Sequence, residues 1–405
     1  VPVGGKIELE EAMARLMEDG VLRKKLSEGA LLAIKNLPSK EETMALYKQS
    51  WEKADKRVKL LVVTQKVDID DANLGSFHGW LEKLAEKSDL FVVANQVGEY
   101  KLPGNVKVFS LEKEKGHGKI VKFLKYRWLL LSLLQKTDGV FYHMCPEYVL
   151  GAGLCPKIFR KKTLLWYTHK SVNWKLKLAE KLVDKIFTAS KESFRLPSKK
   201  VEVAGHGVDV EKFKYKSSKV NPPAGGQDSK FKIITAGRVA EAKNLHLLIE
   251  AAEILRNKNF NFQIKIAGAP ILESDKKYFE SLKQKIKEKK LEDMIEFVGP
   301  IPNRNIADFY KGGDLFVNLS DTGSLDKAVL EAMACELEIL TSNEAFKNIL
   351  PEENMAPKDS FAIAEKIEKI AKQGSSVRSD FIKYVSDSHS LNVLAGKIIN
   401  FFRVR

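Results

Sequence analysis

Two cations lie five positions apart in a segment that follows an apolar run and precedes a helical pattern. Arg238 comes directly after Gly237, and Lys243 ends the same segment. A glycine lets the backbone approach a ligand closely, arginine can bind a pair of anionic oxygens, and lysine adds a point charge. The spacing therefore favours a pyrophosphate site, although a surface loop with solvated charges has the same pattern.

A second candidate segment runs from Asp321 to Lys327 and leads into an apolar helical stretch that contains Glu331. A glycine-containing turn at a helix N-terminus offers free N–H groups and the positive end of the helix dipole to a phosphate. We expect the Glu331 carboxylate to accept hydrogen bonds from both hydroxyls of a ribose; the alternative is a solvated glutamate on a helix surface. The expected ligand-binding residues of the turn are Gly323, Ser324, Leu325, Asp326 and Lys327.

Alternating short apolar runs and helical periods position these segments. Residues 6–55 are predicted to be helical, whereas a buried strand is predicted from Val58 and five more follow up to Ala189. A second series, with strands ending near Ala236, Ala267, Val298, Asn318 and Thr341, follows a stretch rich in serine, proline and glycine. The predicted organisation is a helical extension (1–55), an α/β domain (56–215), a linker (216–230), a second α/β domain (231–388) and a closing helix (389–405). Two doubly wound parallel sheets bind ligands at the carboxyl ends of their strands.

With Gly268-Ala269-Pro270 and Phe297-Val298-Gly299-Pro300 at two intervening strand ends, these motifs resemble the donor domain of retaining glycosyltransferases of family 4. The resemblance covers roughly residues 59–405 and is strongest over 232–340. It implies the GT-B fold, two Rossmann-like domains facing a cleft. It also implies that Arg238 and Lys243 bind the diphosphate of a nucleotide-sugar such as a UDP- or GDP-sugar, that Glu331 binds the ribose, and that the backbone of Pro300 and Ile301 binds the base.

The chain departs from the family at the sugar-facing position. The family carries two glutamates with seven residues between them, and Gly323 stands where the first is expected. Asp326 and Asp321 are the candidates to replace that carboxylate from the same loop. The glycine usual near the end of the helix is replaced by Glu336, for which the sequence suggests no reason.

The resemblance also assigns roles in the first α/β domain. Gly75 belongs to a glycine loop that faces the donor phosphate and the acceptor, and His169 ends a strand where the family places a histidine that reaches the transferred sugar. A structural role stays open for His169 and for His143, which also ends a strand. His206 replaces the asparagine of a turn before the linker and is interpreted as architectural.

The charge balance points to anionic partners. Lys and Arg outnumber Asp and Glu by 68 to 53, which gives a net charge of +15. Between Lys115 and Lys136, basic and apolar residues alternate as in an amphipathic helix that lies on an anionic membrane, or as in a helix that buries its apolar face on a sheet. No recognised nucleic-acid-binding module occurs, so nucleic acid is not an expected partner.

Other classes of protein fit poorly. Pro156 stands where a dinucleotide-binding glycine motif needs its third glycine, and neither a P-loop nor paired metal-ligand spacings occur. Three cysteines without a Cys-x-x-Cys pair and no long apolar run predict a cytoplasmic protein, peripheral on the inner face of the plasma membrane if the basic helix docks there.

The expected function is transfer of a sugar from a nucleotide-sugar to a hydroxyl acceptor, a glycan, polysaccharide or lipid-linked molecule, with retention and without a metal or resident cofactor. The alternatives are a nucleotide-sugar-binding protein that has lost transfer activity, and a GT-B epimerase or phosphorylase. For residues 1–55 the hypothesis is descent from the closing helices of an adjacent glycosyltransferase, on the strength of Leu22–Glu28 and Ser50–Ala54.

Overall fold

The computed structural model describes residues 6–35, 37–46, 57–72, 74–214, 230–321, 323–373 and 378–403. The chain divides into two compact units, Val1–Arg57 and Val58–Arg405. The predicted linker 216–230 falls outside the described residues except at its last position, and so does the segment Ser50–Ala54.

The described residues of the first unit are largely helical, as the periodicity predicts. It contains α1 (Lys6–Glu18) and α2 (Gly20–Lys35), and residues 40–46 are also helical. The Asp19 carboxylate accepts hydrogen bonds from the N–H groups of Val21 (3.0 Å) and Leu22 (2.8 Å), which caps α2. The hypothesis that residues 1–55 descend from the closing helices of an adjacent glycosyltransferase stays a prediction.

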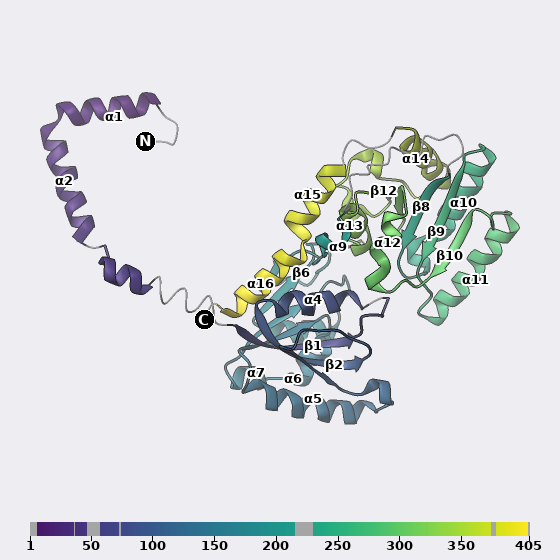
Figure 1. Ribbon diagram of the computed structural model, residues 1–405, viewed down its shortest axis with the longest axis horizontal. Helices are drawn as coiled ribbons and strands as arrows, with labels where there is room; N and C mark the ends of the chain where they lie inside the picture. The colour runs from purple at the N-terminus through teal and green to yellow at the C-terminus, as the bar shows by residue number, and fades with distance from the viewer. Residues whose placement is uncertain are drawn as a thin grey trace. The chain divides into compact units, whose positions relative to one another are not determined.

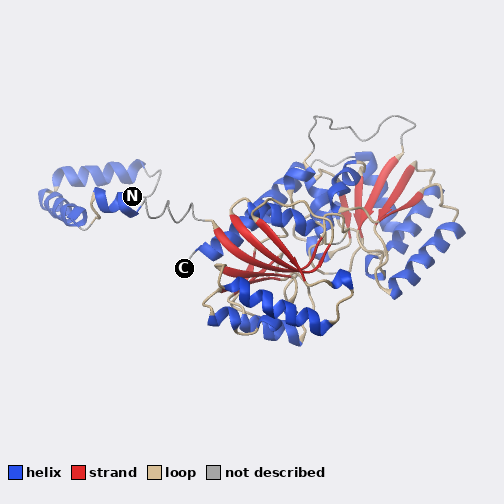
Figure 2. Ribbon diagram, turned by 60° about the horizontal axis from the view of Figure 1, so that its bottom comes forward, coloured by secondary structure: helices blue, strands red, loops and turns tan. Residues whose placement is uncertain are grey.

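The second unit begins with the N-terminal lobe, which is built on a seven-stranded sheet of parallel pairs. The strand order is β3-β2-β1-β4-β5-β6-β7, so the chain winds outward from β1 in both directions. Figure 2 shows the strands in red with blue helices on either side. The strands are β1 (Val58–Val67), β2 (Ser88–Val97), β3 (Val106–Ser110), β4 (Gly139–His143), β5 (Lys162–Trp166), β6 (Lys185–Thr188) and β7 (Val201–Val203).

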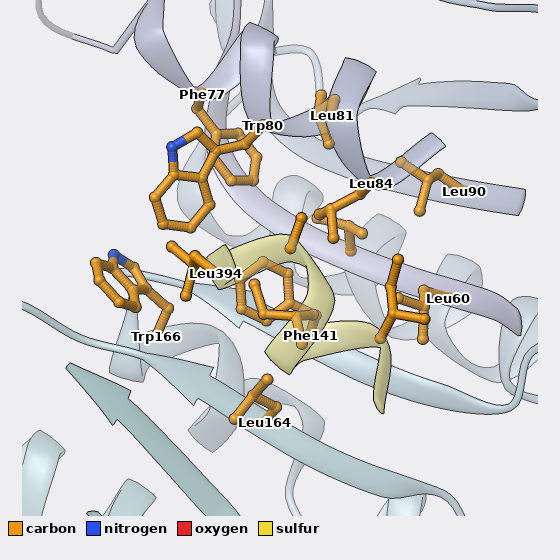
Figure 3. Packing of buried hydrophobic residues seen from close by; sticks show 14 of the residues in the cluster. Leu60, Phe77, Trp80, Leu81, Leu84, Leu90, Phe141, Leu164, Trp166 and Leu394 are labelled. Atoms are coloured by element: carbon orange, nitrogen blue, oxygen red, sulfur yellow. The ribbon is translucent and has the colours of Figure 1, made fainter. Parts of the chain in front are cut away.

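Helices cover both faces of this sheet because successive strand residues point to opposite sides. On one face Leu60 lies in a cluster with α4 (Ser76–Ala85) and α16 (Leu391–Arg403), and Figure 3 shows Trp80 and Leu394 in this packing. The opposite face is covered by α5 (Lys119–Leu134), α6 (Pro146–Ala152) and α8 (Trp174–Leu182). The short elements of the lobe are η1 (Lys113–Lys115), α7 (Cys155–Ile158) and α9 (Val210–Phe213).

The C-terminal lobe has a five-stranded parallel sheet in the order β10-β9-β8-β11-β12. The strands are β8 (Phe231–Ala236), β9 (Phe262–Ala267), β10 (Ile295–Gly299), β11 (Leu315–Asn318) and β12 (Glu338–Thr341). One face packs against α10 (Leu245–Asn257), α11 (Glu273–Glu288) and α14 (Ser360–Gln373). The other packs against α9, α12 (Ile306–Lys311), α13 (Lys327–Ala334) and α15 (Arg378–His389). The short 3-10 turns are η2 (Glu241–Lys243), η3 (Asn303–Asn305), η4 (Glu344–Phe346) and η5 (Glu352–Asn354).

The last helix returns to the N-terminal lobe. After α15 the chain forms a bridge between Ser390 and Val208, and α16 then lies beside α4 (Figure 1). Gly139 permits this approach, since a Cβ atom there would lie 2.4 Å from the ring of Phe402. The architecture is therefore the predicted one, with two doubly wound α/β lobes.

The predicted basic helix at Lys115–Lys136 is shorter than expected. Lys115 belongs to the separate turn η1, and α5 begins only at Lys119. Gly116 has a φ of 77° and Gly118 is extended, so neither can continue a helix from η1 into α5.

Candidate functional site

A cavity of about 190 Å³ lies between the lobes, at the carboxyl ends of β8, β9 and β10. The N-terminal lobe contributes Ala72 and Ser76 to its wall. The cavity brings together predicted site residues from three segments of the C-terminal lobe: Gly237, Pro300, Ile301, Lys327 and Glu331.

Backbone turns form one wall of this cavity. The Gly237 N–H donates to the Ala267 carbonyl (3.0 Å), and the Gly268 N–H donates to the Gly299 carbonyl (2.8 Å). Gly268 has a φ of 136°, and a Cβ atom there would lie 1.8 Å from the Gly237 oxygen. Only glycine fits at this point, so the loops after β8 and β9 touch through their backbones.

Two side chains of the C-terminal lobe contact the carboxylate of Glu331. Tyr310 Oη donates a hydrogen bond to Oε2 (3.2 Å), and Lys327 Nζ lies 3.7 Å from Oε1. Burial, reinforced by Glu331, raises the pKa of Tyr310 well above its usual value, so its hydroxyl keeps the proton that it donates. Because a carboxylate has about four acceptor sites, Glu331 retains capacity for the two hydroxyls of a ribose.

Lys327 also lines a second cavity, of about 230 Å³, which shares Ser76, Asn303 and Glu331 with the first. Burial lowers the pKa of Lys327, and the neighbouring Glu331 acts in the opposite direction. The side chain of Lys327 thus lies where the two cavities meet and contacts Glu331 there.

The loop between β1 and α4 closes the second cavity from the N-terminal lobe. Gly75 lines it, and a Cβ atom there would lie 2.3 Å from the Asp71 carbonyl oxygen and 3.2 Å from the Asn303 side chain. Next to it, Arg304 and Asp70 form an ion pair between the lobes (3.0 Å). The predicted glycine loop thus meets the loop after β10.

Arg238 and Lys243 line a third, small hollow together with Gly237. Each cation already faces a carboxylate: Arg238 Nε lies 3.5 Å from Asp275 Oδ2, and Lys243 Nζ lies 2.9 Å from Asp326 Oδ2. The Arg238 side chain is 42% exposed and so remains open to a ligand. The two predicted phosphate ligands are neighbours in space.

Asp326 has a more constrained environment than its loop position suggests. Its Oδ2 also accepts a hydrogen bond from Asn318 Nδ2 (2.9 Å). Burial raises the pKa of Asp326, but Lys243, Asn318 and Ser320 outweigh that effect and hold it below the usual value. Asp326 is thus ionised and forms an ion pair with Lys243 at the start of α13.

Other predicted residues of this turn lie outside the three cavities. The Ser324 carbonyl accepts a hydrogen bond from Asn343 Nδ2 (2.9 Å), and the Leu325 side chain is buried. The Leu325 carbonyl accepts from His206 Nε2 (2.7 Å). Gly323 has a φ of 58°, which glycine adopts without strain. His206 therefore stabilises the backbone of this turn through its hydrogen bond to Leu325.

The histidines at the strand ends have different surroundings. His169 is exposed, and its Nδ1 accepts a hydrogen bond from the Ser171 N–H (3.0 Å); it lines none of the three cavities. His143 is buried, stacks on Phe77 at a centroid distance of 3.8 Å, and hydrogen-bonds Thr64. Burial, with a smaller effect of Lys327, lowers the pKa of His143 to about 3, so it is neutral.

Two general features complete the description of the site. In the part of the chain that the structure describes, we find no cluster of three or more His, Cys, Asp or Glu side chains arranged to hold a metal ion. No helix in the same described ranges has the length and apolar character needed to cross a bilayer.

The fold is that of GT-B proteins. The crystal structure of Anabaena Alr3699/HepE in complex with UDP and glucose superimposes with a TM-score of 0.67 at 16% identity, over 86% of this chain and all (100%) of that one. Sucrose-phosphate synthase from Thermosynechococcus elongatus gives a TM-score of 0.65 at 14% identity, over 86% and 98%.

Residues 217–387 match the family model described as glycosyl transferases group 1. The amylovoran biosynthesis glycosyltransferase AmsK of Erwinia amylovora is 29% identical over 167 residues, which cover 40% of this chain and 38% of AmsK. Mannosylfructose-phosphate synthase of Agrobacterium fabrum is 29% identical over 104 residues, 25% of this chain and 23% of the synthase. The chain thus aligns with well under half the length of these relatives.

Proposed function

We propose that this protein transfers a sugar from a nucleotide-sugar to a hydroxyl group of an acceptor. The observation that carries the proposal is Glu331, a buried carboxylate with spare acceptor capacity, in a cavity that also contains Pro300 and Ile301. A nucleoside fits this arrangement, with the base against Pro300 and Ile301 and the ribose on Glu331. The neighbouring hollow then receives the diphosphate. HepE, which has the same fold, was crystallised with UDP and glucose, which supports a nucleotide-sugar as the class of ligand.

In the proposed reaction, the bond between the anomeric carbon and the diphosphate oxygen breaks as the acceptor oxygen bonds to the same carbon. The acceptor's proton passes to the departing diphosphate. Arg238 and Lys243 stabilise the charge that grows on this leaving group. We propose retention at the anomeric carbon and no requirement for a metal ion, since fixed cations can provide the stabilising charge.

Contact between the lobes supports transfer rather than hydrolysis. Gly75 and the Asp70–Arg304 pair bring the N-terminal lobe against the donor cavity. Such closure excludes water, which would otherwise compete with the acceptor hydroxyl.

The experiment is turnover by the wild-type protein and an Arg238→Ala/Lys243→Ala variant, with UDP- and GDP-sugars as donors. Each lost charged hydrogen bond costs about 1.5–3 kcal/mol, so the double variant should be slower by about a hundredfold or more. Lys258→Ala, which removes a surface lysine paired with Glu368, is the matched control. Equal turnover by the double variant would contradict the assignment.

A nucleotide-sugar-binding protein without transfer activity is the second candidate. Gly323 removes the sugar-facing carboxylate that the family resemblance implies, and Asp326 occupies Lys243. Binding of UDP or GDP without transfer or hydrolysis of any donor, across simple sugar, glycan and lipid-linked acceptors, would favour this candidate.

We also propose that α5 docks on an anionic membrane and that the acceptor is lipid-linked. Ile120 (77%) and Trp128 (66%) are largely exposed, and Phe123 and Leu124 extend the same apolar surface. Lys122 lies on the same helix. Apolar side chains flanked by lysines suit the cytoplasmic leaflet, where each cation near anionic lipid adds about 1 kcal/mol.

Vesicle sedimentation tests the docking proposal. Binding to phosphatidylglycerol vesicles should fall at least about tenfold in a Phe123→Ser/Trp128→Ser variant, because both side chains would leave the interface. Phe361→Ser, which removes an exposed phenylalanine (67%) from the C-terminal lobe, should bind as the wild type does. Unchanged binding of the α5 variant would overturn the proposal.

A further inference from the structure

Arg195 of the N-terminal lobe lies opposite Gly323 of the C-terminal lobe. Its Nη2 is 3.4 Å from the position that a Cβ atom would take at Gly323. The Arg195 side chain is exposed, and within the described ranges no hydrogen bond or ion pair joins it to another residue. A guanidinium without a partner at the junction of two lobes is available to a ligand.

The loop that carries Arg195 is anchored. Phe194 is buried and packs edge-on against Tyr167, with 6.1 Å between ring centroids. Ser190 and Ser193 share a hydrogen bond between their hydroxyls (2.9 Å). The backbone that presents Arg195 is therefore held by the core on one side and by its own turn on the other.

The surroundings of Gly323 are rich in positive charge. Burial raises the pKa of Asp321, but hydrogen bonds from Lys358 and Asn244 hold it below its usual value, with smaller effects of the charges of Lys358 and of Lys170 in the loop after β5. Asp321 forms an ion pair with Lys358. Asp326 is likewise neutralised by Lys243. Asp321 and Asp326 thus have cationic partners, whereas Arg195 has no anionic partner in the part of the chain that the structure describes.

Glu192 is the carboxylate of the Arg195 loop itself. Its charge acts on Tyr384 of α15, where it helps to raise the pKa of that hydroxyl after the larger effect of burial. No ion pair between Glu192 and Arg195 occurs among the residues described. Glu192 therefore does not pair with the guanidinium of Arg195.

The residue at position 323 determines which ligand groups can approach the Arg195 guanidinium. A glutamate at this position would bring its carboxylate to Arg195 and neutralise it, whereas glycine leaves the guanidinium facing an open position. A guanidinium has only donors and pairs best with a carboxylate, by two parallel hydrogen bonds. Sugar hydroxyls, which also donate, are weaker partners.

We propose that Arg195 and the space at Gly323 form a subsite for the carboxylate of an acidic donor sugar, a uronic acid. The inference rests on the proposed function, because the loop of Gly323 also carries Asp326, the partner of the presumed diphosphate ligand Lys243. In this proposal, a sugar attached to that diphosphate extends from Lys243 along the loop of Gly323 toward Arg195.

Isothermal titration without acceptor tests the subsite. The probes are UDP, UDP-glucose and UDP-glucuronic acid, and GDP, GDP-mannose and GDP-mannuronic acid. The wild-type protein should bind the acidic member of one pair at least about tenfold more tightly than the neutral one, as a charged bidentate contact requires. Arg195→Ala should remove this preference, Arg195→Lys should keep part of it, and Lys191→Ala, a control in the same exposed loop, should keep all of it.

The other outcomes separate this inference from the proposed function. Binding of UDP or GDP with no preference for the acidic sugar overturns the subsite and leaves the proposed function standing. Equal weakening of acidic and neutral donors in Arg195→Ala places Arg195 on the diphosphate and also overturns the subsite. Failure of both nucleotides to bind overturns the proposed function itself.

Discussion

The Lys243 ammonium lies 2.9 Å from the Asp326 carboxylate, at the point where α13 begins. Asp326 also accepts from Asn318 and is buried, so the pair is ordered before any ligand arrives. A diphosphate that binds Lys243 must compete with the Asp326 carboxylate, which lowers the affinity for the diphosphate. The same carboxylate keeps Lys243 paired when no ligand is bound.

Asp326→Asn should therefore strengthen the binding of the preferred nucleoside diphosphate by about threefold to tenfold. The amide keeps a hydrogen-bonding group near Asn318 but releases the charge of Lys243, and a charged hydrogen bond is stronger than a neutral one. Isothermal titration with UDP and GDP measures the change, and Glu368→Gln, a surface carboxylate paired with Lys258 and Lys372, is the control. Weaker binding in Asp326→Asn would mean that Asp326 positions Lys243 rather than competes with its ligand.

The ribose assignment of Glu331 predicts a specific pattern with modified ligands. The wild-type protein should bind a 2′-deoxynucleoside diphosphate about tenfold more weakly than the ribonucleotide, since one hydrogen bond to a carboxylate is lost. In Glu331→Gln that difference should shrink to about twofold, because the charged acceptor is gone. Tyr310→Phe, which removes only the supporting hydroxyl, should keep most of the discrimination. An undiminished difference in Glu331→Gln would exclude Glu331 from the ribose.

His206 should make the protein sensitive to mild acid. Burial lowers its pKa to about 3, against 6.5 for an ordinary histidine. Below pH 6.5 this histidine becomes protonated in the unfolded chain but stays neutral in the folded protein. The stability that it contributes is therefore fully present above pH 6.5 and falls as the pH drops toward 3. The loss at pH 5.5 is about 1 kcal/mol for this residue.

Urea unfolding at pH 7.5 and pH 5.5 measures that loss. His206→Gln can still donate from its amide to the Leu325 carbonyl but cannot titrate, so it should lose about 1 kcal/mol less than the wild type over this interval. His117→Gln, at a partly exposed histidine beside Glu112, is the comparison. Equal losses in His206→Gln and the wild type would show that His206 does not carry the effect.

Gly268→Ala should damage the wall of the donor cavity. The added Cβ atom would lie 1.8 Å from the Gly237 oxygen at a φ of 136°, so the loops after β8 and β9 must separate. We expect a loss of about 2–4 kcal/mol in stability, visible as a lower melting temperature, together with weaker nucleotide binding. Gly104→Ala, where no atom lies within 4 Å, should leave both unchanged. A melting temperature equal to that of the wild type would contradict this view of the wall.

The sequence predicts well which residues of the C-terminal lobe line the first cavity, because these residues follow parallel strands whose carboxyl ends meet at one edge of a sheet. Gly237, Pro300, Ile301, Lys327 and Glu331 come together for this reason. Periodicity also locates most strands, although it misses the short edge strand β7.

Contacts between distant segments could not be predicted in the same way. Tyr310 belongs to a helix whose apolar pattern marks it as core, yet its hydroxyl reaches Glu331. Arg195 comes near Gly323 only because the two lobes face each other. His169 illustrates the reverse case, since a strand end brings a residue to the correct edge but does not direct its side chain, which here bonds to its own loop.

The return of α16 makes the N-terminal lobe discontinuous in sequence. Leu394, Ile398 and Phe402, from the far end of the chain, complete a core that otherwise consists of residues from the first lobe. A fragment that stops after α9 would leave that core open to water. Exchanging the donor-binding half with that of a relative therefore requires two junctions, one near residue 214 and one near Ser390, so that the recipient keeps its own last helix.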